Sequence, residues 1–279
     1  TGLIDEILSL RQEQAKLLGY ASYAEVSLVP KMARSPQQVI DFLEDLARRT
    51  RPGAEKEMAA LRAFARAELG IDTLEPWDVT FASEKLKEAK YALSQEMVRP
   101  YFPAPRVIRG MLHIAEKLYG LSIAERHDVV TWHPDVTYYE ISEQGEVIAS
   151  FFLDPYARAH KRGGAWMADC RVRRRLEDGS LQKPVAFLTC NFNPPVEGKP
   201  ALLTHDEVTT LFHEFGHGLH HMLTRQEVAA VSGINGVAWD AVELPSQFFE
   251  NWCWAAEPLA LIASHVEGGE PLPVDLLEK

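Results

Sequence analysis

Two histidines and a glutamate stand at a spacing that could bind a metal ion and use it. The sequence reads His213-Glu214-Phe215-Gly216-His217. Helical residues four apart lie one turn apart and only about 40° round the axis, so both imidazoles can reach one ion. Zinc takes such nitrogen ligands in a tetrahedral arrangement. Glu214, beside the first histidine, can hold a water on the metal without binding the metal itself.

The residues around the two histidines predict the helix that this geometry requires. Thr204 and Glu207 have the spacing of a capping box, with Thr204 as the N-cap and Glu207 reaching back from the third helical position. Apolar residues then recur at helical spacing. They are Val208, Leu211, Phe212, Phe215 and Leu219. We therefore expect His213 and His217 on one capped, amphipathic helix.

A zinc site also needs a third protein ligand and one position left open for water. The pattern with Gly and His three and six residues after the second histidine fails, because His220 and Leu223 stand there. After a glycine-containing loop, residues 240–243 can begin a second helix that runs back past the first. Glu243 is the natural third ligand. Asp240 is the alternative, although an N-cap role suits it better.

Other side chains could also take part in the site. His220 and His221 lie on or near the same helix face, but three ligands from His213 to His220 on one straight helix would be strung along about 10 Å of axis. They are more typical of supporting or solvent-facing residues. Asp206 could accept a ring N–H and fix a tautomer, or it could simply match the positive end of the helix. The more distant carboxylates are Glu250 and Glu257.

Two stretches of the sequence resemble the thimet oligopeptidase family of zinc metallopeptidases. They are residues 211–221, around the histidines, and residues 240–252, which read Asp-Ala-Val-Glu-Leu-Pro-Ser-Gln-Phe-Phe-Glu-Asn-Trp. The resemblance also includes residues 154–158 and 183–192, and it covers essentially the whole chain. It implies one Zn²⁺ per chain, held by the ligands His213, His217 and Glu243, and it implies that Glu214 is the catalytic carboxylate.

The resemblance implies a mostly helical fold, and the strand patterns described below add a small β-sheet, so we expect a mainly α fold with a small β-sheet. Such a segment would be the zincin-type catalytic core of a two-lobed helical peptidase that contains a channel. We expect a helical scaffold over residues 1–130, followed by the small sheet and the zinc-binding helices over residues 131–279. Family members extend beyond both ends of this segment, and their Tyr- and Gly-rich substrate-binding stretch lies downstream. We therefore expect a chain truncated at both ends, with an incomplete substrate cleft when isolated.

Apolar periodicity and turn residues predict the individual elements. A first helix should end near Gly19, a second should open at Ser35-Pro36, and a third should open at Pro52 and end near Gly70. A further helix covers about 106–119. The predicted strands are residues 136–141, 147–153 and 185–192, and the first two form a hairpin.

The excess of acidic residues disfavours negatively charged binding partners. The chain has 40 acidic and 29 basic residues and a formal net charge of −11. That balance argues against nucleic acid or an anionic membrane, because both favour clustered Lys and Arg. The basic run at 171–175 is short. The three cysteines show no pattern of a disulfide framework or a Cys-based zinc site, so a reducing, cytoplasmic setting fits best.

The sequence therefore favours a zinc-dependent endopeptidase that cleaves internal bonds of short, unfolded peptides, with no obligate protein partner. Glu214 would be the general base and then the general acid. The alternatives are a helical structural or binding domain without catalysis and a metal-dependent amidase. A cysteine hydrolase using Cys190 is disfavoured, because no His or Asn can be paired with it and a buried thiol is more typical.

Overall fold

The computed structural model describes residues 2–277 and divides the chain into two compact units. One unit comprises the residues up to Ala92 together with Ala238–Asp240, and the other comprises Leu93–Val237 with Ala241 and the residues after it. Both chain ends, Thr1 and 278–279, lie outside the described residues. The expected truncation at these ends stays a prediction.

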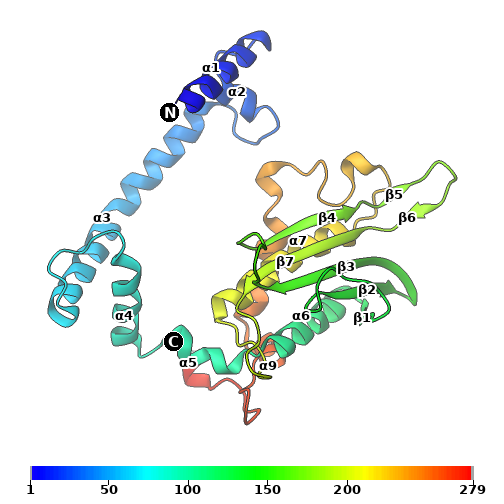
Figure 1. The fold of residues 1–279 in the computed structure, drawn as a ribbon. Helices are drawn as coiled ribbons and strands as arrows, with labels where there is room; N and C mark the ends of the chain where they lie inside the picture. Colours follow the sequence, from blue (N-terminus) through cyan, green and yellow to red (C-terminus); the bar gives the residue numbers. More distant parts are fainter. Residues whose placement is uncertain (1, 278–279) are drawn as a thin grey trace. The chain divides into compact units, whose positions relative to one another are not determined.

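The first unit consists of helices. They are α1 (Gly2–Leu17), α2 (Tyr23–Leu28), α3 (Pro36–Leu69) and α4 (Val79–Tyr91) (Figure 1). The predicted ends of α3 are confirmed: Ser35 accepts the N–H of Gln38 at 3.2 Å, and Gly70 caps the helix with φ +67°. The predicted break at Pro52 is wrong, because α3 runs through it. A proline removes one helical hydrogen bond, and the Ala-, Glu- and Arg-rich flanks keep the helix continuous.

The second unit is built on a mixed sheet. Its strands are β1 (Ser122–Glu125), β2 (Thr137–Glu143), β3 (Glu146–Tyr156), β7 (Val185–Phe192) and β4 (Trp166–Arg171), in the order β1-β2-β3-β7-β4. Only β3 and β7 run parallel. A separate ribbon pairs β5 (Arg174–Arg175) with β6 (Leu181–Gln182). The predicted hairpin and the strand at 185–192 are confirmed, whereas β1 and β4 were not predicted.

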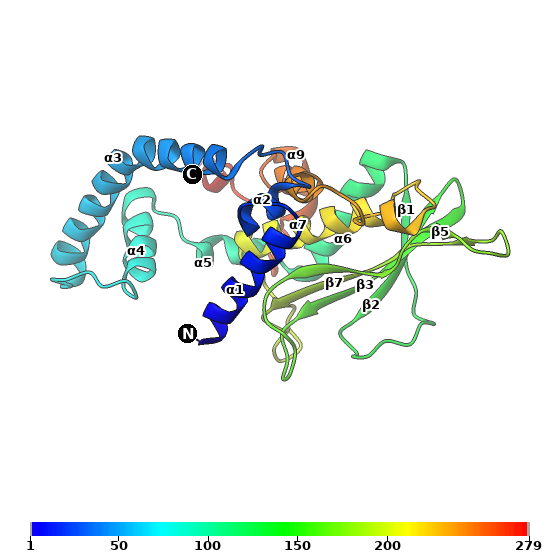
Figure 2. The same cartoon turned by 90° about the horizontal axis from the view of Figure 1, so that it is seen from above.

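The helices of this unit are α5 (Gln95–Val98), α6 (Ala104–Tyr119), α7 (His205–Met222), α8 (Leu244–Glu250), α9 (Ala256–Ile262) and α10 (Val274–Leu277). Of these, α6 and α7 pack against the sheet, whereas α8 packs on α7 and α9 packs on α6. Figure 2 shows α6 and α7 on the same side of the sheet. The core lies between these layers, where Phe151 of β3 meets Phe215 of α7 with ring centroids 5.6 Å apart. The predicted class, mainly α with a small sheet, is confirmed, since about 49% of the chain is helical.

Helix α6 belongs to the unit that contains the sheet, whereas the sequence had grouped it with the N-terminal helices. The sequence grouped residues 106–119 with the helical scaffold that ends at residue 130. In the structure the unit that holds the sheet begins at Leu93, and α6 contributes Val107, Met111 and other buried residues to the same core as the strands. Among the described residues, no helix combines the length and apolar character that a membrane crossing needs.

A buried ion-pair network holds the end of β3. Asp154 is only 3% exposed. It accepts hydrogen bonds from Arg158 Nη1 at 2.7 Å, Lys161 Nζ at 2.8 Å and Trp132 Nε1 at 3.1 Å. Lys161 also donates to the backbone oxygen of Tyr156 at 2.7 Å. Burial alone would raise the pKa of Asp154, but these donors outweigh it and lower the pKa.

Asp154→Asn should therefore lower the free energy of unfolding by roughly 3–5 kcal/mol, because Lys161 would stay buried without its counter-charge. Urea denaturation measures this. Because the pKa of Asp154 is lowered from 3.8, its contribution is full above that pH and is lost as the pH falls through the folded value. Arg158→Gln is the control, since it keeps the Asp154–Lys161 pair. An equal or smaller loss in Asp154→Asn would contradict the prediction.

Candidate metal centre

The helix that carries both histidines starts at the predicted capping box. Thr204 Oγ1 accepts the N–H of Glu207 at 3.1 Å, and Glu207 Oε2 accepts the N–H of Thr204 at 2.8 Å. The apolar face of α7 is buried in the core. Because that face fixes the rotation of the helix, His213 and His217 emerge together on another side. Their ring centroids lie 4.9 Å apart.

The chain returns after α7 and brings Glu243 to the two imidazoles. Glu243 Oε2 lies 3.2 Å from His213 Nε2 and 3.1 Å from His217 Nε2. Ligand atoms of these three residues all lie within 4.8 Å of one another. Within residues 2–277, no other three His, Cys, Asp or Glu side chains converge in this way. The three residues that the sequence singled out as ligands therefore come together.

The start of the second helix differs from the prediction. Asp240 lies in a 3-10 turn, Trp239–Ala241, and α8 begins only at Leu244. The expected N-cap role of Asp240 is therefore wrong, and Glu243 itself occupies the position before the helix. Pro245 explains the shift, since proline favours the first turn of a helix. Asp240 is not part of the converging group.

A second carboxylate determines which way the His213 ring faces. Glu250 Oε1 lies 2.6 Å from His213 Nδ1. An ionised carboxylate only accepts hydrogen bonds, so we assign the ring proton to Nδ1. The Nε2 lone pair then points toward Glu243 and His217. The sequence offered Glu250 only as a distant ligand candidate. Glu250 follows Glu243 by seven residues, or about two helical turns. That spacing could have predicted that both carboxylates lie on the same face of one helix.

This arrangement brings three potential ligand atoms together: His213 Nε2, His217 Nε2 and Glu243 Oε2. Burial lowers the pKa of His217 below its ordinary 6.5, which favours the neutral ring with a free lone pair. In a neutral imidazole one ring nitrogen carries no proton, and that nitrogen can bind a metal ion. The separations of 3.1 and 3.2 Å are close to the edge, about 3.3 Å, of a tetrahedron with zinc–ligand bonds of about 2.0–2.1 Å. The donor set therefore fits a zinc ion.

Glu214 lies in a different environment from Glu243. Its side chain is buried, at 7% exposed, whereas Glu243 is open to solvent. Burial raises the pKa of Glu214, and the negative charge of Glu243 raises it further. His213 and a backbone hydrogen bond from Met167 of β4 act in the opposite direction. A raised pKa makes the protonated form of a carboxyl group easier to reach, which suits a group that takes up and then releases a proton.

The remaining polar residues of α7 have supporting positions. His221 is fully buried and donates from Nε2 to the backbone oxygen of Arg171 at 2.9 Å, so it ties the end of β4 to α7. His220 is partly buried, and burial lowers its pKa. Asp206 is exposed, and Glu250, not Asp206, accepts the ring proton of His213.

The cysteines do not form a second candidate site. Cys190 is fully buried, and burial raises the pKa of its thiol to about 12. Cys253 is also fully buried, and its pKa is likewise raised to about 12 by burial. A thiol with such a pKa is protonated at neutral pH and is a poor nucleophile. This counts against the cysteine hydrolase considered from the sequence.

Comparison with known proteins identifies the family. The model of Peptidase family M3 matches residues 1–279. The chain is 62% identical over 278 residues to oligopeptidase A of Escherichia coli, covering 99% of the chain and 41% of that protein. It is 45% identical over 287 residues to organellar oligopeptidase A of Arabidopsis thaliana, covering 100% of the chain and 36% of the relative.

A dipeptidyl carboxypeptidase of Salmonella typhimurium is 37% identical over 279 residues, which cover 99% of the chain and 40% of the relative. The chain thus spans about two fifths of the length of these relatives. The resemblance seen in the sequence is confirmed by the family match and by the level of identity. The chain belongs to Peptidase family M3.

Proposed function

We propose that this chain is the zinc-binding, catalytic part of a metalloendopeptidase that hydrolyses internal bonds of short, unfolded peptides. The observation that carries the proposal is the convergence of His213, His217 and Glu243, whose ligand atoms lie within 4.8 Å of one another and could hold one metal ion. Membership in Peptidase family M3 supports peptide hydrolysis. The relatives named oligopeptidase A support oligopeptides as the substrate class. The cytoplasmic setting stays a prediction.

The donor set suits a catalytic rather than a structural zinc site. His213, His217 and Glu243 would supply three ligands, the number typical of catalytic zinc, and leave the fourth position for water or substrate. When bound there, zinc polarises the scissile carbonyl and lowers the pKa of water to about 7. Glu250 would keep the His213 ring in the tautomer that offers Nε2.

Glu214 supplies the proton transfers in this proposal. Its carboxylate accepts the proton of the attacking water and then delivers it to the nitrogen of the leaving amine. The raised pKa helps the second transfer, because the protonated form is easier to reach in a buried site. Glu214 is not a fourth ligand in this proposal, because its side chain is buried and it is not among the three residues whose ligand atoms converge.

The edge of the sheet offers a place for the peptide backbone. β4 is the last strand in the order β1-β2-β3-β7-β4, so among the described residues no further strand pairs with its outer edge. Extended peptides often bind by adding a strand to such an edge. The backbone of Met167 in β4 makes a hydrogen bond to Glu214. A peptide bound along β4 would therefore lie near the proposed catalytic carboxylate.

Glu214→Gln in the full-length protein should keep the metal and lower kcat/KM by about 10²–10⁴-fold, because the proton acceptor is lost while the ligands remain. Hydrolysis of a quenched fluorescent peptide measures the rate, and elemental analysis measures the metal. A small amide assayed in parallel tests for amidase activity. Wild-type peptide hydrolysis by this variant would refute the role of Glu214.

Glu243→Ala should weaken zinc binding by more than the roughly 10–100-fold typical of losing an outer partner, because a direct ligand is removed. Competition with a chelator measures the dissociation constant. Asp240→Asn is the matched control and should bind zinc as the wild type does. Unchanged affinity in Glu243→Ala would move the third ligand to Asp240 or His220.

Glu250→Gln should weaken zinc binding by about 10–100-fold, because the charge that orients the His213 ring is removed while the shape is kept. The same chelator competition measures the effect. Glu257→Gln changes an exposed carboxylate of α9 and serves as the control. Equal affinities in the two variants would exclude an orienting role for Glu250.

A further inference from the structure

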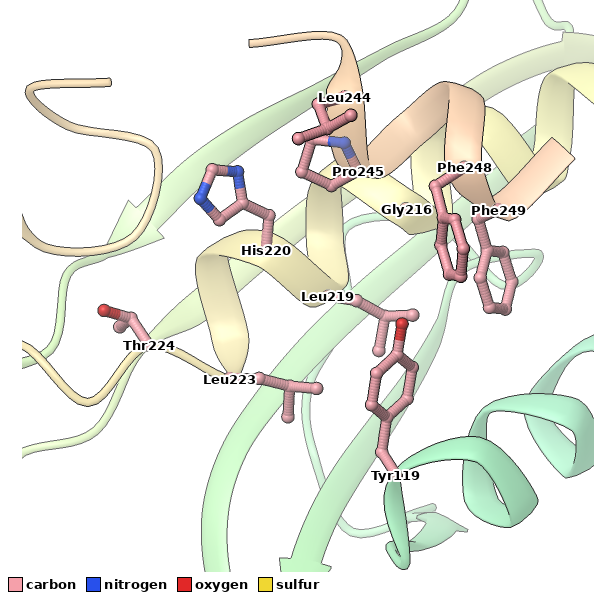
Figure 3. Close-up of a pocket in the computed structure, with 10 residues that line it drawn as sticks. All are labelled: Tyr119, Gly216, Leu219, His220, Leu223, Thr224, Leu244, Pro245, Phe248 and Phe249. Atoms are coloured by element: carbon pink, nitrogen blue, oxygen red, sulfur yellow. The ribbon is translucent and has the colours of Figure 1, made fainter. Parts of the chain in front are cut away.

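Gly216, inside the metal-binding sequence, lies where α8 packs closely on α7. A Cβ atom at this position would lie 2.7 Å from the backbone oxygen of Pro245 and 2.7 Å from Ser246 Cα. It would also lie 3.1 Å from Phe249 Cβ. Figure 3 shows Gly216 on α7 beside Pro245, Phe248 and Phe249 of α8. The nearest atoms belong to the backbone of α8, so no side-chain rotation could relieve the contact.

The same turn of α8 holds Glu243. Ser246 is fully buried, and its Oγ lies 2.9 Å from Glu243 Oε2 and 2.9 Å from the Glu243 backbone oxygen. Oε2 is also the oxygen that faces His213 and His217. Pro245 and Ser246 follow Glu243 by only two and three residues, so a displacement of this turn also displaces the carboxylate.

We propose that Gly216 and Ser246 are positioning residues for Glu243. Gly216 sets the distance, because the missing side chain lets the first turn of α8 approach α7 closely enough for Oε2 to reach both histidines. Ser246 sets the orientation, because its hydroxyl hydrogen-bonds to the Glu243 carboxylate. This inference rests on the proposed function, in which Glu243 is a metal ligand.

Gly218, two residues further along α7, provides a matched comparison. A Cβ atom at Gly218 would lie 2.9 Å from Leu188 Cδ2, the far end of a flexible side chain that can move aside. Both glycines are buried in the same helix, and Gly→Ala raises the helix propensity equally at both. The two substitutions therefore differ mainly in whether α8 must move.

The experiment compares Gly216→Ala, Gly218→Ala and Ser246→Ala in the full-length protein. Zinc affinity is measured by chelator competition, the visible spectrum is recorded with Co²⁺ in the site, and thermal unfolding is followed without metal. We expect Gly216→Ala to weaken zinc binding at least about 10-fold and to change the Co²⁺ spectrum. Ser246→Ala should weaken zinc binding about 10–100-fold, while Gly218→Ala should leave affinity and spectrum near wild type.

Several results would overturn the inference. Gly216→Ala could lower the melting temperature of the metal-free protein with unchanged zinc affinity and Co²⁺ spectrum, which would be a purely structural effect. If Gly216→Ala does not fold, Ser246→Ala decides alone, since it removes an atom and adds no clash, and wild-type affinity there refutes the proposal. A wild-type protein that binds no zinc would instead refute the proposed function itself.

Discussion

The site depends on one geometric constraint: three potential metal ligands from two separate segments of the chain must converge on one point. Two imidazole nitrogens and a carboxylate oxygen approach to 3.1 and 3.2 Å. The protein keeps them together by packing. The buried face of α7 fixes the histidines, and the close contact of α8 at Gly216 fixes Glu243. In the proposed function, a cation binds all three atoms, so folding and metal binding are coupled.

Much of this site could be predicted because its signals are local. His217 follows His213 by four residues, and the capping box and apolar stripe lie within α7 and the N-cap residue just before it. The hairpin at β2 and β3 was equally readable, since alternating β-rich runs flank Gln144-Gly145. Each of these features is decided by neighbours along the chain, which is why periodicity and turn residues suffice.

The rest depends on contacts between distant segments. Glu250 contacts His213 across 37 residues, and no pattern within the α7 segment indicates that pair. β4 has a weak strand pattern and forms because β7 pairs with it. At Pro52 the sequence predicted a new helix because proline favours a first turn. The structure instead has one continuous helix, so this local preference was given too much weight. Sequence spacing could not decide between Asp240 and Glu243 as the third ligand. In the structure α8 begins after Glu243, and only Glu243 of the two belongs to the converging group.

The most direct test of the central claim is a crystal structure of the full-length protein with anomalous data collected at the zinc absorption edge. The proposal predicts one zinc peak per chain, within about 2.0–2.2 Å of His213 Nε2, His217 Nε2 and a Glu243 carboxylate oxygen. A fully loaded crystal with its zinc elsewhere, or with Glu243 turned away from the two histidines, would contradict it.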